Sequence, residues 1–557
     1  MRIAIIGGVA GGASAATRAR RMDEKAEITI YEKGPYISYA NCGLPYYVGG
    51  IIEDRQALLL ETPESLWDRF RIAVRVNTLV TAIEPTSGNL KFVQDDRPGE
   101  AGFDRLILAP GATPIVPSVV GLERPDVFLV RTVSDALRLR DHLDSGRVTR
   151  AVVVGAGFIG LEVAEMLLHR EIEVTVVDMA AHVLPPLDAD IAGVLESHLH
   201  ALGVQLRMNS TLQGIHGSIG GPLVELSSGT ISTDMVVVGL GVRPSIDLAQ
   251  SMGLRLGQTG AVQVDSHMQT SHPRVWAAGD AVEKFDLVTK APRWWPLAAT
   301  ANKEGRVAGT NAAGGNATFS GSLGTAIMRF GPHVVGVTGL TEKAAQKAQI
   351  PYRAIHTVRG NHAAYYPGAH DILIKLLYDP EDGRVLGAQA IGESGVDKRI
   401  DVIATAIHGK LGIDDLADLD LAYAPPIGSA KDAVVITGMG AANARAGLVD
   451  SVSASELERW LSMPDRPFLL DVRDANETRE TGIIPGAHHI PLNHLRSRLS
   501  EVPSDRPIVT YCRSGHRSYV ATRILRQHGR RDTYNLSGGI TLWGIGHATA
   551  TPEVSQL

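Results

Sequence analysis

The sequence predicts an α/β protein with several domains, and three observations support this class. The chain has 557 residues, and typical domains have ~100–200, so we expect roughly three to five domains. A pattern of apolar strand, glycine turn, helix and second strand occurs twice, at 1–32 and 150–178. A hairpin pattern, "ILIKLLYDPEDGRVLGAQAIG" (372–392), separates these repeats from a distinct C-terminal region.

The composition is that of an ordinary globular protein. Hydrophobic residues make up 44%, charged residues 20%, and the net charge is -6, so we expect no nucleic-acid surface. Two cysteines, Cys42 and Cys512, exclude a disulfide framework and indicate a reducing compartment. No apolar run approaches the ~20 residues that span a bilayer, and "MRIAIIGG" is too short for a signal peptide. We therefore expect a cytoplasmic protein with no membrane partner and no metal.

The second repeat fits a dinucleotide site. Gly155, Gly157 and Gly160 form G-x-G-x-x-G, and Asp178 ends the following strand. Such glycines let the backbone approach a pyrophosphate at a helix N-terminus, and the acid binds a ribose hydroxyl. This favours NADH over NADPH, because the neighbouring Met179 supplies no cation for a 2′-phosphate.

The first repeat departs from that pattern. Gly7 and Gly12 hold the outer positions and Glu32 ends the second strand, but Val9 replaces the middle glycine. Taken alone, these residues also fit an ordinary strand–helix turn. Two later stretches favour a cofactor site: "FDRLILAPGATP" (103–114) and "VWAAGDAVE" (275–283) each read as a strand meeting a glycine turn.

In this order, the four motifs resemble those of the flavin-dependent pyridine nucleotide–disulfide oxidoreductases over residues 1–445. The resemblance implies FAD at the first repeat, the nicotinamide cofactor at the second, and a dimerisation domain after them. It places Asp280 against the ribityl–phosphate region of the flavin. The expected cofactor-binding residues are Gly7, Gly8, Ala10, Gly11, Gly12, Glu32, Lys33, Val80, Ala109, Pro110, Gly111, Gly155, Gly157, Phe158, Ile159, Gly160, Asp178, Gly241, Gly279 and Asp280.

Cys42 lies in "SYANCGLPYY" (38–47) and has no partner cysteine nearby. Most members of the family use C-x4-C, but here Tyr47 holds the second position, so that internal disulfide cannot form. A lone thiolate can attack a disulfide or persulfide or cycle through sulfenic acid. The stretch resembles the coenzyme A–disulfide reductase subfamily, as do "NHAAYYPGA" (361–369) and "LDLAYAPPIGSAKD" (419–432).

This second resemblance implies that Cys42 holds the substrate sulfur and that two tyrosines act on the departing thiolate. We assign Tyr365 and Tyr423, with Tyr366 as the alternative to Tyr365. Arg18 and Arg21 share a helix face and fit phosphate groups, although a solvated basic face explains them equally well. The expected coenzyme A contacts are Arg18, Arg21, Ser38, Asn41, Asn302 and Lys431, with either Arg69 or Arg71 as a further cation.

Cys512 lies in "YCRSGHRS" (511–518), between an apolar strand and a helix. Inward backbone N–H groups, a helix N-terminus and the cations Arg513 and Arg517 favour a thiolate there; a buried, inert cysteine is the alternative. Together with "FLLDVRDANE" (468–477), "GIIPGAHHIPL" (482–492) and "LSGGITLW" (536–543), the stretch resembles the rhodanese domain, which carries sulfane sulfur as a cysteine persulfide. The six-residue loop and Tyr511 favour sulfur over phosphate chemistry.

The predicted fold is therefore α/β, with two Rossmann-like dinucleotide-binding domains, an α+β dimerisation domain and a C-terminal α/β rhodanese domain. The expected boundaries are 1–112 with 246–324 for FAD, 113–245 for NAD, 325–445 for dimerisation and 452–557 for the rhodanese domain.

As a whole, the chain resembles fusions of coenzyme A–disulfide reductase with rhodanese, the NADH-dependent persulfide reductases. We expect a homodimeric enzyme that reduces coenzyme A persulfide or polysulfide through Cys42, with Cys512 handling sulfane sulfur and hydrogen sulfide released. Alternatives are a coenzyme A disulfide reductase, an NADH oxidase or peroxidase that uses a Cys42 sulfenic acid, and a sulfur carrier without NADH turnover. The first helix lacks the catalytic histidine of the oxidases and peroxidases that the chain resembles.

Overall fold

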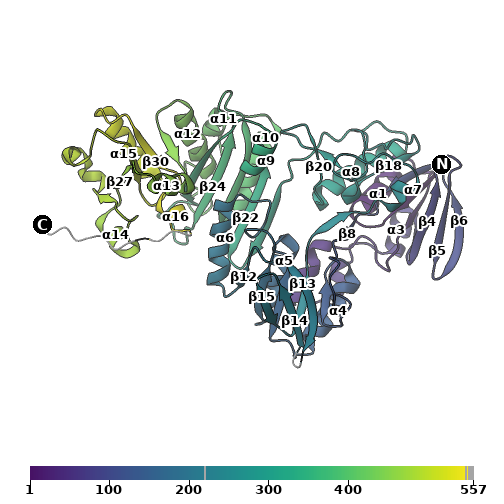
Figure 1. Cartoon of the computed structure of the whole chain (residues 1–557). Coiled ribbons are helices and arrows are strands. Elements are labelled where there is room, and N and C mark those ends of the chain that lie inside the picture. Colours follow the sequence, from purple (N-terminus) through teal and green to yellow (C-terminus); the bar gives the residue numbers. More distant parts are fainter. Residues whose placement is uncertain (219–220, 546–548, 550–557) are drawn as a thin grey trace. The chain divides into compact units, whose positions relative to one another are not determined.

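A computed structural model describes residues 1–218, 221–545 and 549, and the chain forms two compact units (Figure 1). The first comprises Met1–Val183 and Gly203–Gly324, and the second comprises Leu184–Leu202 and Thr325–Leu557. The end of the predicted 452–557 domain, residues 546–548 and 550–557, lies outside the described residues.

The first repeat forms a parallel five-stranded sheet in the order β18-β7-β1-β2-β3, as the strand–glycine–helix–strand pattern predicts. Consecutive apolar side chains of its strands, such as those of residues 3–6 and 106–108, are buried in the core of this unit, as is typical of a parallel sheet. The strands are β1 (Arg2–Ile6), β2 (Glu27–Tyr31), β3 (Ile72–Arg75), β7 (Arg105–Leu108) and β18 (Val275–Ala277), and the main helices are α1 (Ala10–Met22) and α8 (Ala298–Ala312).

Glycines allow α1 and α8 to approach each other closely. A Cβ atom added to Gly305 would lie 2.2 Å from the carbonyl oxygen of Gly11, and one added to Gly309 would lie 2.3 Å from that of Ala15. Both distances are shorter than real Cβ contacts, so larger residues would force the helices apart. The small-residue composition of α1 is therefore a packing requirement as well as a turn signal.

The second repeat forms a second parallel sheet, in the order β12-β11-β10-β16-β9. The third motif glycine has the same packing role in both repeats: a Cβ on Gly12 or on Gly160 would lie 1.9 Å from the carbonyl oxygen of Gly7 or Gly155 respectively. The strands are β9 (Val127–Leu129), β10 (Arg150–Val154), β11 (Glu173–Val177), β12 (Gln205–Arg207) and β16 (Met235–Val238), and the helices are α4 (Val133–Asp144) and α5 (Phe158–His169).

Smaller elements complete the first unit. Two antiparallel three-stranded sheets and two strand pairs connect the main sheets. They are β4 (Thr78–Glu84), β5 (Asn89–Gln94), β6 (Arg97–Gly102), β13 (Leu212–Ser218), β14 (Gly221–Leu226), β15 (Gly229–Ser232), β8 (Ala112–Pro114), β17 (Val242–Pro244), β19 (Lys284–Phe285) and β20 (Pro292–Arg293), with the helices α2 (Leu44–Gly49), α3 (Pro63–Phe70) and α7 (Asp247–Ser251).

The second unit begins with an antiparallel sheet in the order β21-β22-β25-β24-β23. The pairing of β24 with β25 confirms the hairpin predicted at 372–392. The strands are β21 (Ala326–Phe330), β22 (His333–Gly339), β23 (Arg353–Gly360), β24 (Asp371–Tyr378) and β25 (Val385–Gly392), and the helices are α6 (Ala189–Ala201), α9 (Glu342–Lys347), α10 (Val396–His408), α11 (Ile413–Asp418) and α12 (Ala433–Arg445).

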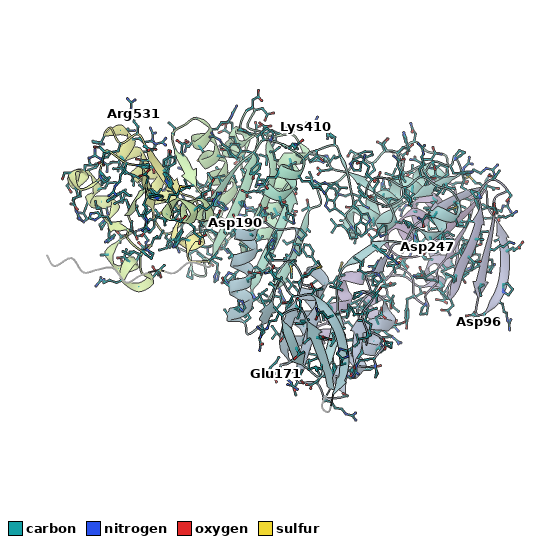
Figure 2. All side chains as sticks on the ribbon, in the orientation of Figure 1. Asp96, Glu171, Asp190, Asp247, Lys410 and Arg531 are labelled. Atoms are coloured by element: carbon teal, nitrogen blue, oxygen red, sulfur yellow. The ribbon has the colours of Figure 1, made fainter. Side chains whose placement is uncertain are left out.

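A buried charge network joins α6 to this sheet. The Lys375 ammonium on β24 is 1% exposed and lies 2.8 Å from an Asp190 carboxylate oxygen and 3.0 Å from an Asp188 oxygen. Asp190 lies at the start of α6 and is labelled in Figure 2. Removing one partner of such a group would leave a buried charge uncompensated, which costs about 3–5 kcal/mol. α6 is therefore fixed to the sheet by charge as well as by apolar packing.

The C-terminal domain is a parallel sheet in the order β26-β30-β29-β27-β28. Ser453 caps α13 with a capping box. The strands are β26 (Asp450–Val452), β27 (Phe468–Asp471), β28 (His488–His489), β29 (Ile508–Tyr511) and β30 (Thr533–Leu536), and the helices are α13 (Ala454–Leu461), α14 (Ala475–Thr481), α15 (His516–Gln527) and α16 (Gly539–Trp543).

Candidate functional site

Both glycine turns of the first unit are held by the acid that ends the second strand of the repeat. The Glu32 carboxylate accepts hydrogen bonds from the Gly8 and Gly34 amides, each at 2.9 Å. The Asp178 carboxylate accepts from the Ala156 amide at 2.7 Å and the Ala180 amide at 2.8 Å. Each acid is thus oriented at the end of a parallel strand, where this fold places the ribose of a dinucleotide.

The residues predicted to hold NADH surround open space. A Cβ atom added to Gly157, or to Gly241, would meet no atom within 4 Å. A small hollow is lined by Ile159, Gly241 and Arg131 among others. The turn at the N-terminus of α5 therefore leaves room for a pyrophosphate, and these residues fit the group that the sequence predicts.

The predicted flavin residues Gly279 and Asp280 are held by buried charges. The Gly279 amide donates to the Glu304 carboxylate at 2.8 Å, and the Lys284 ammonium lies 3.6 Å from that carboxylate. Burial raises the pKa of Glu304 to about 7, while Lys284 opposes the shift. The Asp280 carboxylate lies 3.4 Å from the Arg131 guanidinium. Asp280 is thus fixed at the edge of the first sheet, as a ribityl contact requires.

Other predicted cofactor residues differ in exposure. A Cβ on Gly7 would lie 2.1 Å from the Ala109 carbonyl oxygen, so the first turn packs directly on the 109–111 segment. Val80 is buried in β4, whereas Lys33 is exposed.

Cys42 lies in a short 3-10 turn, Asn41–Gly43, that leads directly into α2. The residue is exposed, yet its surroundings favour the protonated thiol. Desolvation raises the pKa of Cys42, the carboxylates of Glu162 and Asp280 raise it further, and Arg131 lowers it. The protein groups around Cys42 therefore make the thiolate costly.

Glu162 on α5 is an ionisable neighbour of Cys42 that the sequence analysis did not select. Burial raises the pKa of Glu162 to about 7, and the nearby Glu165 carboxylate adds to the shift. α2 packs against α5 at Gly49, where an added Cβ would lie 2.5 Å from the Met166 sulfur. Because Glu162 titrates near neutral pH, its charge and the ionisation of Cys42 are coupled.

The predicted coenzyme A residues of the first unit gather along α1 and α8. The Asn302 side chain accepts a hydrogen bond from Ser14 at 2.7 Å, and Arg18 donates to Thr310 at 2.8 Å. Arg21 is exposed on the same helix. Asn41 Oδ1, next to Cys42, is buried without a hydrogen-bond partner among the described residues, as expected for an atom that meets a ligand.

The other residues of the first unit predicted to contact coenzyme A show no feature that indicates a ligand. Ser38 has a positive φ of 42° and donates its amide to the Gly8 carbonyl at 2.8 Å, so it lies against the first glycine turn. Arg69 pairs with Glu61 at 2.8 Å, and Arg71 lies 3.9 Å from Asp68. Both arginines are exposed, and neither is favoured over the other.

The two predicted tyrosines meet in the second unit. The hydroxyl groups of Tyr365 and Tyr423 lie 2.8 Å apart, and the side chains are 76% and 48% exposed. The Tyr366 ring instead packs edge-on against His362. The geometry therefore favours Tyr365 over Tyr366 as the partner of Tyr423.

A buried ion pair fixes the segments that carry these tyrosines and Lys431. The Arg399 guanidinium lies 2.7 Å from the Asp432 carboxylate and donates to the Asn361 carbonyl at 2.8 Å. Asp432 also caps α12 through the Val434 amide. Lys431, next to Asp432, is thus exposed on a rigid support.

Cys512 follows β29 directly, and its loop binds its own sulfur. Sγ accepts a hydrogen bond from the Gly515 amide at 3.2 Å and lies 3.5 Å from the Ser518 hydroxyl. Gly515 has φ +94° and precedes α15, so the N-terminus of that helix points toward the sulfur. Cys512 is only 1% exposed, which is the burial expected of an inert cysteine. Two hydrogen-bond donors nevertheless contact its sulfur.

The two predicted arginines of this loop are both ion-paired. The Arg517 guanidinium lies 2.5 Å from the Glu477 carboxylate and 3.1 Å from that of Asp474. The Arg513 guanidinium lies 2.9 Å from the Asp371 carboxylate on β24. Their charges are therefore partly neutralised by neighbouring acids.

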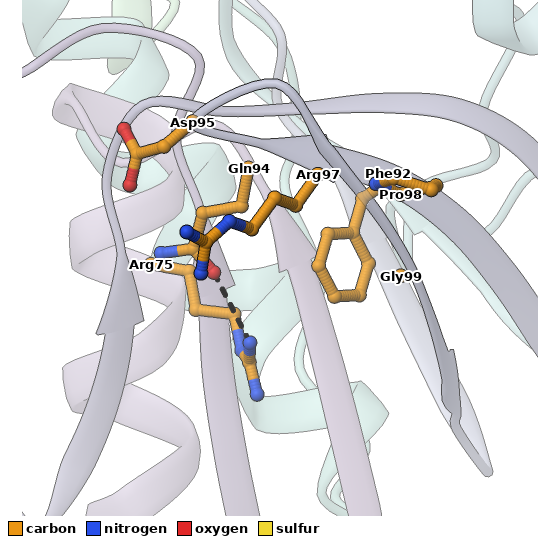
Figure 3. A pocket seen from close by; sticks show the side chains of 7 residues that line it. All are labelled: Arg75, Phe92, Gln94, Asp95, Arg97, Pro98 and Gly99. Atoms are coloured by element: carbon orange, nitrogen blue, oxygen red, sulfur yellow. Dashed lines mark hydrogen bonds between the residues drawn. The ribbon is translucent and has the colours of Figure 1, made fainter.

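The structure thus gathers the predicted residues into two groups, one in each unit. Cys42, the glycine turns and Asn302 lie in the first unit, and Tyr365, Tyr423, Lys431 and Cys512 lie in the second. The open hollow of Figure 3 contains none of the predicted residues: it is formed by the β5–β6 hairpin and the end of β3, and its lining is Arg75, Phe92, Gln94, Asp95, Arg97, Pro98 and Gly99.

Sequence reasoning missed Arg131, Glu162, Glu304 and Arg399. Glu162 carried a usable signal, since it is a charged residue two positions after the last glycine of the motif in "GAGFIGLEVAE". The others act through contacts distant in sequence, such as the pair of Arg131 with Asp280, 149 positions away. No motif spacing indicates these pairs.

Three family matches cover most of the chain. Residues 1–305 match Pyridine nucleotide-disulphide oxidoreductase, and residues 325–434 match the dimerisation domain of that family. Residues 453–545 match the Rhodanese-like domain.

Solved structures and curated relatives agree with these matches. Reduced CoADR-RHD of Bacillus anthracis is 42% identical, with a TM-score of 0.94 and 98% of each chain covered. An NAD-dependent persulfide reductase from A. fulgidus is 37% identical, with a TM-score of 0.92 over 98% of this chain and 100% of that one. A protein named NADH oxidase from Methanocaldococcus jannaschii is 35% identical over 77% of this chain and 95% of its own.

Proposed function

Because the chain belongs to the pyridine nucleotide-disulphide oxidoreductases, enzymes that use FAD and NAD(P)H, we propose that it reduces sulfane sulfur carried by coenzyme A. NADH is the proposed reductant, since the Asp178 carboxylate is presented for a ribose hydroxyl. The observation that carries the proposal is the Cys512 loop, in which the Gly515 amide donates to the cysteine sulfur, in the same chain as a lone Cys42. A plain disulfide reductase has no sulfane sulfur for such a loop to carry.

In the proposed reaction the Cys42 thiolate attacks the inner sulfur of coenzyme A persulfide. A Cys42–coenzyme A disulfide forms, the persulfide bond breaks, and hydrogen sulfide leaves. Bound FAD and NADH supply the two electrons that return Cys42 to the thiol and release coenzyme A. The Tyr365–Tyr423 hydroxyl pair is the proposed proton donor to the departing thiolate. Arg18, Arg21, Asn302 and Lys431 are the proposed coenzyme A contacts.

The match to a dimerisation domain supports a homodimer. No helix among the described residues is long and apolar enough to cross a membrane, and a cytoplasmic location is part of the proposal. The proposed boundaries remain 1–112 with 246–324, 113–245, 325–445 and 452–557. Deletion of residues 452–557 tests the last of these, because the remaining chain is expected to keep NADH turnover.

Anaerobic NADH oxidation tests the proposed substrate. We expect a kcat/KM for coenzyme A persulfide at least about tenfold above that for coenzyme A disulfide, and a lower rate with NADPH. Equal or greater efficiency with the disulfide would show that disulfide reduction is the main role.

The strongest competing function is an NADH oxidase, the name of one curated relative. The sequence of α1, "AGGASAATRARRM", has no histidine to assist oxygen or peroxide chemistry. Oxygen uptake with NADH as the only other substrate separates the two functions. The proposal requires an uptake rate far below the persulfide-dependent rate.

A further inference from the structure

The Cys512 loop is attached to the antiparallel sheet of the same unit at two points. The Arg513 guanidinium lies 2.9 Å from the Asp371 carboxylate, at the start of β24. The Ser537 hydroxyl, in the loop that packs on the Cys512 backbone, lies 2.8 Å from His356 Nδ1 on β23. The ends of β23 and β24 therefore help to form the surroundings of Cys512.

Arg359 is the cation that these strands contribute. It lies one residue before the end of β23, and Gly360 beside it pairs in register with Asp371. Burial lowers the pKa of the Arg359 guanidinium, and the nearby Cys512 and Asp371 anions oppose that shift. Arg359 is thus a half-buried cation near the sulfur of Cys512.

The Arg359 guanidinium differs from the guanidinium groups of the Cys512 loop in its partners. Arg513 and Arg517 are paired with Asp371 and with Glu477. Within residues 1–218 and 221–545, the side chain of Arg359 makes no hydrogen bond and no ion pair closer than 4 Å. The guanidinium donors of Arg359 are therefore available to an anionic ligand.

Lys431 adds a second positive charge to the region of Arg359. After burial, the cations Arg359, Arg517 and Lys431 are the groups that lower the pKa of His516, the first residue of α15. Arg359 and Lys431 therefore lie close enough to act on one side chain of the Cys512 loop. Both come from the sheet domain and not from the rhodanese domain.

We propose that Arg359, assisted by Lys431, completes the Cys512 site as a binding group for the oxyanion of a sulfur compound that exchanges sulfane sulfur there. This rests on the proposed function in one respect, that Cys512 carries sulfane sulfur. The oxyanion belongs either to a sulfonate donor such as thiosulfate or to a phosphate-bearing thiol acceptor such as coenzyme A. Both present oxygen atoms that guanidinium donors bind well.

The two half-reactions balance without an external oxidant. In loading, the Cys512 thiolate attacks the outer sulfur of thiosulfate, a new S–S bond forms, and sulfite leaves with the electron pair of the broken bond. In discharge, an acceptor thiolate attacks the outer sulfur of the persulfide, and Cys512 leaves as the thiolate. The outer sulfur lies about 2 Å beyond Sγ, the length of an S–S bond.

The test measures sulfur transfer by the full-length protein without NADH, so that it does not depend on the reductase reaction. Arg359→Gln is compared with the wild type for loading from thiosulfate, for discharge to coenzyme A, and for discharge to pantetheine, a thiol without phosphates. Loss of one charge-assisted hydrogen bond is expected to raise KM about tenfold for the anionic partner. The kcat with pantetheine is expected to be unchanged.

A rise in KM for thiosulfate alone assigns the oxyanion to the donor, and a rise for coenzyme A alone assigns it to the acceptor. Arg359→Lys is expected to restore part of the affinity, which a purely structural role would not predict. Arg353→Gln, at the other end of β23, is the matched control. The proposal is overturned if Arg359→Gln leaves both KM values within twofold of the wild type, or if pantetheine is affected as strongly as coenzyme A.

A failure of the proposed function has a different signature. A wild-type protein that transfers no sulfur at all would overturn the role of Cys512, and with it this inference. A wild-type protein that transfers sulfur but does not reduce coenzyme A persulfide with NADH would overturn only the reductase proposal.

Discussion

Cys42 and Cys512 lie in opposite electrostatic surroundings. Cys42 is exposed, yet desolvation raises its pKa and the carboxylates of Glu162 and Asp280 raise it further. Cys512 is buried, yet it accepts a hydrogen bond from the Gly515 amide in a loop rich in cations. One site disfavours a thiolate, and the other offers hydrogen-bond donors to its sulfur.

The difference fits two kinds of sulfur chemistry. A carrier must hold a persulfide anion between two encounters, so donors fixed in its own loop are useful throughout the cycle. A redox cysteine must gain and lose bonds to sulfur in each turnover, and a thiolate that is too stable is a poor nucleophile. The acidic neighbours of Cys42 keep its nucleophilicity high at the cost of a smaller thiolate fraction.

The largest expected effect comes from exchanging each sulfur for oxygen. Cys42→Ser is expected to lower NADH-dependent persulfide reduction by at least about a thousandfold, because serine is not a thiolate nucleophile at neutral pH. Sulfur transfer from thiosulfate to cyanide is expected to remain. Cys512→Ser is expected to show the reverse pattern, measured by thiocyanate formation. If either variant lost both activities, the two cysteines would form one site and the comparison would fail.

The next effect concerns the backbone donor of the Cys512 loop. Gly515 has φ +94°, a conformation that costs an L-residue about 1–2 kcal/mol. Gly515→Ala is expected to displace the amide from Sγ and to lower sulfur transfer about tenfold in the thiocyanate assay. Gly529→Ala is the matched control, because Gly529 has φ +87° in the same domain with no atom near an added Cβ. Equal losses in both variants would point to general strain.

A smaller effect is expected at the acidic side of Cys42. Glu162 has a pKa of about 7, so rising pH ionises it and its charge then raises the pKa of Cys42. Glu162→Gln removes that charge, so the pKa of Cys42 is expected to fall. The rate of Cys42 alkylation by iodoacetamide at pH 7.5 is expected to rise about three- to tenfold.

The exposed Glu173→Gln, on β11, is the control for that measurement. An unchanged alkylation profile in Glu162→Gln would mean that desolvation alone sets the pKa of Cys42. The difference in charge between the surroundings of Cys42 and those of Cys512 would then have no effect on Cys42.

Much of the fold followed from local pattern. The repeats at 1–32 and 150–178 and the hairpin at 372–392 are encoded within short stretches, and each is confirmed. The coupling of Glu162 to Cys42 was not predicted, because it depends on how α2 packs against α5.

Arg359 shows the same limit at the other cysteine. It precedes Cys512 by 153 positions in the sequence, and its role depends on how β23 and the rhodanese loop meet. Spacing identifies groups that share one turn or one loop. It does not identify charges that tertiary packing brings to a site from another domain.

The smallest expected effect concerns Arg513, the exposed cation of the Cys512 loop. Arg513 and Asp371 are 58% and 42% exposed, and ion pairs of this kind contribute about 0–1 kcal/mol. Arg513→Gln and Asp371→Asn are each expected to change the KM for thiosulfate less than about threefold, with the difference shrinking at high salt. A loss above tenfold in Arg513→Gln alone would mean that Arg513 binds the sulfur compound itself. The cationic character of the site would then come from its own loop, and Arg359 would be secondary.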